Sequence, residues 1–262
     1  MPLNKALALN YIEYGQGRPV IILHGLFGSA RNWQGIARSL AESHHVITPD
    51  LRNHGLSPHT DSMSYEEMAE DIITLADKLK LDDIILVGHS MGGKVAMTAA
   101  LQNPEHFTAL IVADIAPVNY KHGFKLLVAA MNSLDLKSLK NRNEAETELR
   151  KTTNETSVVQ FILQNLIRSE GNFCWRINLE QITASLSSIS EFPSSLSSMN
   201  SRLPSLFLGG AESDYLLSIY NTAIYQYFPA AEITMIEGAG HWLHAEKPNE
   251  FLNEVKTFIN YV

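Results

Sequence analysis

Short apolar runs alternate with amphipathic stretches over the first 118 residues of the chain. Residues 19–23 and 84–87 are almost wholly apolar and largely β-branched, which is typical of strands buried on both faces. Between them, Ser64 and Glu67 form a capping-box pattern, and the apolar residues that follow recur at helical spacing, so a helix is expected to begin there. Strands that alternate with helices predict an α/β fold with a mostly parallel sheet and helices on both of its faces. Further strands are expected at residues 11–14, 45–48, 110–113, 206–208 and 233–236, and further helices at residues 33–42, 94–102 and 249–261.

The pattern changes after Pro117, beyond which no strong signal for a parallel strand occurs until the region around residue 206. Helices are expected instead at residues 143–151 and 156–168, before a serine-rich stretch at residues 185–201. Apolar side chains such as Val158 and Phe161 need a surface on which to pack, so this region is not a linker. We predict a helical cap, residues 119–201, inserted into a core formed by residues 1–118 and 202–262.

Composition narrows the functional classes. Hydrophobic residues make up 45% of the chain and charged residues 18%, which is ordinary for a globular protein. The net charge of −8 argues against a nucleic-acid partner, because binding to phosphates needs clustered lysines and arginines. A single cysteine, Cys174, excludes an internal disulfide and a four-thiolate zinc site. The N-terminal residues do not form a secretion signal and no apolar run is long enough to cross a bilayer, so we expect a cytoplasmic protein without a membrane span.

A possible nucleophile, Ser90, lies in the sequence Gly-His-Ser-Met-Gly between a predicted buried strand and a predicted helix. This is the setting of a nucleophile elbow, in which a tight turn lifts the serine hydroxyl to the N-terminus of a helix. Because the turn is tight, the residues two before and two after the serine must be small, and here they are Gly88 and Gly92. The other interpretation is a glycine-rich turn that only packs the helix on the strand.

A serine nucleophile needs a base, and His241 is the best-placed of the ten histidines. It follows the last predicted strand in the sequence Gly-Ala-Gly-His-Trp, so it should lie at the same edge of the sheet as Ser90. A metal pair with His244 is conceivable, but no third ligand has suitable spacing. We therefore expect neither a metal nor a cofactor.

The sequence His-Gly-Leu-Phe-Gly that begins at His24 follows another central strand. Taken alone it is an ordinary turn, but beside a nucleophile elbow it predicts half of an oxyanion hole. The expected donors are the backbone N–H groups of Leu26 and Met91, aimed where negative charge develops on the substrate oxygen. Phe27 is close enough to this loop to line a substrate pocket.

These motifs resemble the α/β-hydrolase superfamily in their order and spacing. Within it, the chain is similar to small bacterial esterases and acyl-CoA thioesterases related to the mitochondrial α/β-hydrolase-domain proteins. The resemblance implies hydrolysis of esters or thioesters through an acyl-serine, and an eight-stranded sheet with the cap inserted after the sixth strand. It is carried by residues 24–29 (HGLFGS), 50–57 (DLRNHGLS), 88–92 (GHSMG), 114–118 (DIAPV) and 238–248 (GAGHWLHAEKP).

The acid that orients the base has two candidates. In the family, the acid usually stands three residues after a glycine that follows the seventh strand, but that position here is Ser213, and Asp214 is one residue late. Asp114 ends the strand next to the elbow strand and can also reach His241 from the same edge. We favour Asp114, because Asp214 fits the cap of a following helix; Asp214 stays the alternative, with Glu212 after it.

The leading hypothesis is a serine esterase or thioesterase that acts on a small-molecule acyl ester or acyl-CoA. The first alternative is a lyase or a C–C bond hydrolase that uses a similar Ser-His-Asp set on the same fold. A non-catalytic binding protein is the second alternative, and the presence of both Ser90 and His241 argues against it.

Overall fold

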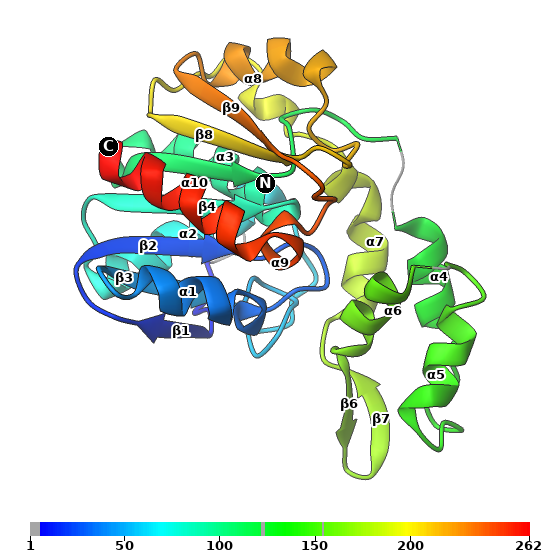
Figure 1. The fold of residues 1–262 in the computed structure, drawn as a ribbon. Coiled ribbons are helices and arrows are strands. Elements are labelled where there is room, and N and C mark those ends of the chain that lie inside the picture. The colour runs from blue at the N-terminus through cyan, green and yellow to red at the C-terminus, as the bar shows by residue number, and fades with distance from the viewer. Residues whose placement is uncertain (1–5, 122–123, 154) are drawn as a thin grey trace.

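The computed structural model describes residues 6–121, 124–153 and 155–262 (Figure 1). Its centre is a seven-stranded sheet in the order β1-β3-β2-β4-β5-β8-β9. The edge strand β1 is antiparallel to β3, and the other neighbouring strands run parallel. The sheet confirms the predicted α/β-hydrolase architecture. Its strands are β1 (Tyr11–Tyr14), β2 (Arg18–Leu23), β3 (His44–Pro49), β4 (Ile84–His89), β5 (Phe107–Ala113), β8 (Ser205–Gly210) and β9 (Ala231–Ile236).

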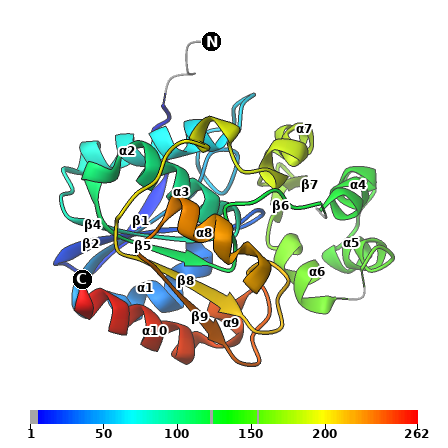
Figure 2. The ribbon, with the colours of Figure 1, turned by 90° about the horizontal axis from the view of Figure 1, so that it is seen from above.

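Helices cover both faces of the sheet, as the alternating pattern predicts (Figure 2). One face carries α2 (Tyr65–Leu79), α3 (Met91–Gln102) and α8 (Asn221–Tyr227), and the other carries α1 (Gln34–Leu40), α9 (Leu243–Glu246) and α10 (Pro248–Tyr261). Successive side chains of a strand point to opposite faces, so the buried strand β2 supplies both layers. Ile21 and Leu23 pack in the core under α2 and α3, whereas Val20 and Ile22 pack in the core under α1 and α10. Within the described residues, no helix is long and apolar enough to cross a membrane.

The described sheet has one strand fewer than the eight that the resemblance implies. Residues 6–10, just before β1, belong to no strand, and side chains take up two of their backbone donors. The N–H of Leu7 donates to Asp71 Oδ1 of α2 at 2.7 Å, and that of Asn10 donates to Ser57 Oγ at 2.9 Å. These two amides are therefore not available to a neighbouring strand.

The described residues between 124 and 190 lie largely to one side of the sheet (Figure 1). They include the helices α4 (Lys125–Ser133), α5 (Arg142–Leu149), α6 (Thr156–Leu163) and α7 (Leu179–Ser190), and a hairpin of β6 (Leu166–Ser169) and β7 (Asn172–Trp175). Residues 191–201 return over the core, where Ser195 bonds Glu66 of α2 and Ser201 bonds Tyr227 of α8. The hairpin corrects the expectation of one helix over residues 156–168. Glu170 and Gly171 both have positive φ, 51° and 85°, and such a pair makes the tight turn that reverses a two-residue hairpin.

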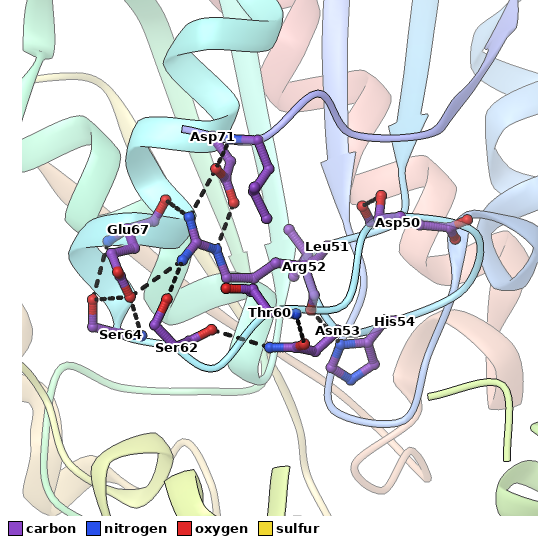
Figure 3. A network of polar contacts seen from close by, with 12 residues as sticks. Asp50, Leu51, Arg52, Asn53, His54, Thr60, Ser62, Ser64, Glu67 and Asp71 are labelled. Carbon is purple, nitrogen blue, oxygen red and sulfur yellow. Dashed lines mark hydrogen bonds and ion pairs between the residues drawn. The ribbon is translucent and has the colours of Figure 1, made fainter. Parts of the chain in front are cut away.

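The loop after β3 is held by a buried polar network centred on Arg52 (Figure 3). Its guanidinium binds Asp71 through Nε at 2.7 Å and Nη2 at 2.9 Å, and its Nη1 lies 3.2 Å from Glu67 Oε2. Ser64 and Glu67 form the predicted capping box at the start of α2. Arg52, which is 1% exposed, therefore braces the loop after β3 against α2.

Candidate active site

Ser90 stands between β4 and α3 with a backbone φ of 53° and ψ of −119°, a combination that a non-glycine residue adopts only under strain. The two flanking glycines are needed because the backbone closes tightly here. A Cβ on Gly88 would lie 2.2 Å from the Gly92 carbonyl oxygen, and one on Gly92 would lie 2.5 Å from the His24 carbonyl oxygen. The turn therefore has the geometry of a nucleophile elbow, with the serine 7% exposed.

His241 lies between Ser90 and Asp114. Its Nε2 is 3.0 Å from Ser90 Oγ, and its Nδ1 is 2.7 Å from Asp114 Oδ2. Two neighbours fix the ring and its loop: His89 Nε2 donates to the carbonyl oxygen of His241 at 2.7 Å, and the Tyr215 ring stacks on the imidazole with centroids 4.1 Å apart. Each ring nitrogen of His241 thus faces one of the two groups predicted to work with it.

Asp114 is fully buried and adopts a positive φ of 50° directly after β5. Besides His241, its carboxylate accepts a hydrogen bond from the Gly210 N–H at 3.0 Å and a short one from the Ser213 hydroxyl. Ser90, Asp114, Ser213 and His241 follow β4, β5, β8 and β9, which are four successive neighbours in the sheet. Since parallel strands bring their carboxyl ends to one edge, the topology itself gathers this set.

The alternative acids do not reach His241. Asp214 and Glu212 are both exposed at the end of β8, and among the bonds within the described residues neither contacts the imidazole. The expectation that Asp214 caps a helix is wrong, because the next helical turn begins at Ser218, behind Leu217. The loop after β8 bends so that Ser213, and not Asp214, faces Asp114.

Two buried histidines hold the loop that carries Leu26 and Phe27. His24 donates from Nδ1 to the Gly25 carbonyl oxygen at 2.8 Å, while its Nε2 accepts from the Leu51 N–H at 3.0 Å. His54 Nε2 accepts from the Phe27 N–H at 3.2 Å. A Cβ on Gly25 would lie 3.2 Å from Ser90 Cβ, so this loop passes directly beside the elbow. Leu26 follows Gly25 there, and Met91 is the first residue of α3, where a backbone N–H has no partner within the helix.

Four buried histidines around the site have lowered pKa values, which agrees with the acceptor role of Nε2 in His24 and His54. Burial lowers the pKa of His24, lowers that of His54 to about 3, and holds that of His89 well below its ordinary value. His244, stacked on Trp33 with centroids 4.2 Å apart, likewise has its pKa lowered by burial to about 3. These rings stay neutral at pH 7 and support the site through hydrogen bonds and packing. Within the described ranges, no three histidine, cysteine or acidic side chains gather as a metal site.

Two largely apolar cavities meet at Ser90. The first includes His241 and Trp242 and is walled by Phe27 and, from residues 119–201, by Leu127 and Phe161. The second reaches past Leu26 and Met91 to Lys94 and Tyr120. Ser90 is therefore reached by a cavity on each of two sides.

Lys94 is the charged group of the second cavity. It is 1% exposed, and its Nζ donates to the carbonyl oxygens of Ser190 and Glu191 at 3.0 and 2.8 Å. Burial lowers its pKa to about 7. The amine therefore joins the C-terminus of α7 to the core beside the elbow.

Several residues that support the site were not predicted from the sequence. Ser213 had a signal, since it stands three residues after Gly210, where the family usually places its acid. His54 and His89 belong to the motifs at residues 50–57 and 88–92, but the motifs do not indicate their hydrogen bonds, because these depend on which backbone groups lie within reach after folding.

Comparison with known proteins agrees with this geometry. The profile of the family described as alpha/beta hydrolase fold matches residues 18–248. A protein named sn-1-specific diacylglycerol lipase ABHD11 from Xenopus tropicalis is 42% identical over 251 residues, which cover 93% of this chain and 78% of the relative. Esterase YbfF from Escherichia coli is 34% identical, covering 92% of this chain and 93% of the relative. A solved structure titled marine microorganism esterase superposes with a TM-score of 0.92 at 39% identity, over 97% of this chain and all of that one.

Proposed function

Because the chain belongs to the alpha/beta hydrolase fold family, we propose that it is a serine hydrolase that cleaves carboxylic esters or thioesters through an acyl-serine intermediate. The observation that carries the proposal is the line of hydrogen bonds from Ser90 Oγ through both nitrogens of His241 to Asp114. The relatives named as lipases and esterases support ester cleavage over the lyase or C–C bond hydrolase alternative.

In the proposed mechanism, Ser90 Oγ attacks the acyl carbon while His241 Nε2 takes the hydroxyl proton. Asp114 holds the Nδ1–H of His241 and so stabilises the imidazolium that forms. The N–H groups of Leu26 and Met91 donate to the oxyanion of the tetrahedral intermediate. His241 then returns the proton to the departing alcohol or thiol.

The second half of the cycle clears the acyl group. Water enters on the side that the alcohol or thiol has left, and His241 takes one of its protons as it attacks the acyl carbon. Collapse of the second tetrahedral intermediate returns the proton to Ser90 Oγ and releases the acid. The proposed mechanism uses only protein side chains and backbone amides, so it requires no cofactor. A cytoplasmic location stays a prediction.

The geometry also assigns the two cavities. The leaving group must receive its proton from His241 Nε2, so it occupies the first cavity, which His241 lines. The acyl chain then occupies the second cavity, behind Leu26 and Met91. Of these two cavities, Phe27 lines the first and not the second, so we place it beside the leaving group.

A covalent probe tests the nucleophile. A fluorophosphonate should label the wild-type protein at Ser90, and Ser90→Ala should remain unlabelled with a kcat for p-nitrophenyl butyrate lower by about a thousandfold or more. Ser198→Ala changes an exposed serine outside the site and should be labelled like the wild type, which controls for the reagent. Labelling of another residue, or near-wild-type turnover by Ser90→Ala, would refute the mechanism. Comparing kcat/KM for a butyrate oxygen ester with that for the butyrate thioester of the same alkyl group would separate esterase from thioesterase activity.

A further inference from the structure

Another cavity lies between the core and residues 119–201 and is lined by three arginines. We call it the arginine cavity and define it by Arg31, Arg142, Arg176, Asn32, Gln164 and Asn165. Arg31 lies in the short 3-10 helix Ala30–Trp33 after β2, Arg142 is the first residue of α5, and Arg176 follows β7. Among the described residues that line the cavity there is no carboxylate, which is unexpected in a chain with a net charge of −8.

The three guanidinium groups are not neutralised by the protein. Of the six arginines outside the cavity, two are paired with a carboxylate: Arg52 with Asp71, and Arg150 with Glu146 at 2.7 Å. In the part of the chain that the structure describes, the ion pairs within 4.0 Å include none of the three arginines of the cavity. Arg142 Nη2 donates only to a backbone oxygen, that of Leu166, at 2.6 Å. Gathered planar donors without an acid partner are suited to an anion with several oxygens, above all phosphate.

The arginine cavity adjoins the leaving-group side of the site. It shares Phe27 and Asn32 with the first active-site cavity, the one that contains His241. Its boundary is formed by side-chain amides that can exchange partners, since Asn32 Nδ2 donates to Gln164 Oε1 at 3.0 Å. The outer cavity that also reaches His241 carries Glu155 and would repel an anion.

We propose that the arginine cavity binds a phosphate group on the leaving-group arm of the substrate, so that the enzyme acts on acyl esters or thioesters whose alcohol or thiol is phosphorylated. This inference rests on the proposed function and names the substrate class for it. Two kinds of molecule have this chemistry: an acyl thioester of a phosphorylated nucleotide thiol such as coenzyme A, and an acylglycerol phosphate. In both, the phosphate lies at a distance from the scissile bond and can extend past Asn32.

Matched substrate pairs test the proposal. The first pair is butyryl-CoA and S-butyryl-N-acetylcysteamine, which share the thioester but not the phosphates. The second pair is a 1-acylglycerol 3-phosphate and the same 1-acylglycerol. The measured quantity is the ratio of kcat/KM for the phosphorylated member to that for the other member.

The test variant is Arg31→Gln/Arg176→Gln, which leaves the Arg142 bond to the Leu166 carbonyl oxygen in place. It should lower the ratio for at least one pair by about tenfold or more through KM, because each arginine offers a charge-assisted hydrogen bond to phosphate. The matched control is Arg38→Gln, an exposed arginine of α1 outside the cavity, which should leave both ratios unchanged. Raised salt should lower the same ratio in the wild-type protein.

The pair that responds identifies the source of the phosphate: the thioester pair indicates a nucleotide thiol, and the glycerol pair indicates an acylglycerol phosphate. If the double variant shifts neither ratio, or slows both members of a pair equally, the inference is overturned. Such a result leaves the proposed function intact as long as Ser90→Ala abolishes hydrolysis of p-nitrophenyl butyrate. Inorganic pyrophosphate should also inhibit the phosphorylated substrate competitively in the wild type and not in the double variant.

Discussion

The carboxyl edge of the sheet and residues 119–201 both face Ser90, but they are held in place by different means. The edge groups are fixed by backbone conformation, as at Ser90 and Asp114 with positive φ, and by hydrogen bonds between the loops of neighbouring strands. Residues 119–201 contribute mainly apolar side chains, such as Leu127 and Phe161, which are placed by packing.

The two means of support match the precision that each region needs. Atoms that exchange protons must hold their positions to a fraction of an ångström, and short loops after parallel strands provide that. Walls that only enclose apolar substrate tolerate larger adjustment. Changes at the edge should therefore act on kcat, whereas changes in residues 119–201 should act mainly on KM.

The largest expected effect at the edge is that of Asp114→Asn. An amide at this position can favour the wrong imidazole tautomer, and kcat should fall by about ten thousandfold, as in the serine-protease template. Asp214→Asn is the control, and it should keep near-wild-type rate and melting temperature because Asp214 is exposed and caps no helix. Both are measured near pH 8 with an aryl ester. Loss of rate in Asp214→Asn alone would contradict the assignment of the acid.

Acid should destabilise the core before it affects residues 119–201. Burial depresses the folded-state pKa of His54 and of His244 to about 3, whereas an unfolded histidine titrates near 6.5. The unfolded chain thus binds more protons below pH 6.5, so stability is complete above that pH and is lost as pH falls toward 3. The described part of residues 119–201 contains no histidine.

These two histidines alone should lower the free energy of unfolding by about 3 kcal/mol between pH 7 and pH 5.5, at about 1.4 kcal/mol each. Denaturant titration at the two pH values measures the loss. His54→Gln keeps a hydrogen-bonding side chain without the titration and should lose about 1.4 kcal/mol less. An equal loss in His54→Gln would show that His54 is already protonated in the fold or does not titrate in this range.

Ser213→Ala should have a smaller effect on the edge. The hydroxyl donates to the same carboxylate oxygen that accepts from His241, so its removal leaves Asp114 less firmly held. A hydrogen bond to a charged group is worth about 1.5–3 kcal/mol, which predicts a loss of at least about tenfold in kcat. In the Asp114→Asn background the same change should cost much less, because the two residues act as one unit. If the losses in activation free energy from Ser213→Ala and Asp114→Asn were fully additive, Ser213 would not act through Asp114.

The smallest expected effect is that of a substitution in the wall of the first active-site cavity. Phe161→Ala removes a ring that packs on Trp242, with centroids 5.9 Å apart, and opens the leaving-group cavity. KM for an ester with an apolar alcohol should rise several-fold with little change in kcat, since only uniform binding is lost. Phe173→Ala, in the hairpin and away from this cavity, is the control for general loosening. If Phe161→Ala lowered kcat as much as Ser213→Ala, the proposed difference between the sheet edge and the cavity walls would be wrong.

The sequence predicts the core well because each buried strand is an uninterrupted apolar run that ends at a turn. The elbow strand before Ser90 and the strand before Asp114 appear within two and three residues of their expected bounds. The hairpin at β6 and β7 was not predicted, because Leu166 and Ile167 also fit the apolar face of the preceding helix. Only the turn at Gly171 distinguishes a hairpin from a longer helix here.

Within the site, residues could be predicted where a local motif requires them and not where a contact is made across the fold. Ser90 and its glycines form such a motif. The preference for Asp114 over Asp214 required knowing which loop bends toward His241, and the argument used for it, a helix cap at Asp214, is wrong. Support by His54 and His89 depends on backbone groups far away in sequence, which no local pattern records.

The order of the functional groups along the chain also bears on how the protein is made. Ser90 and Asp114 are synthesised before residues 119–201, whereas His241 follows β9, the edge strand, which pairs only with β8. A chain emerging from the ribosome thus carries its nucleophile and acid long before its base. In the proposed mechanism, such a nascent chain is inert toward the esters around it, and the last strand to join the sheet switches the enzyme on.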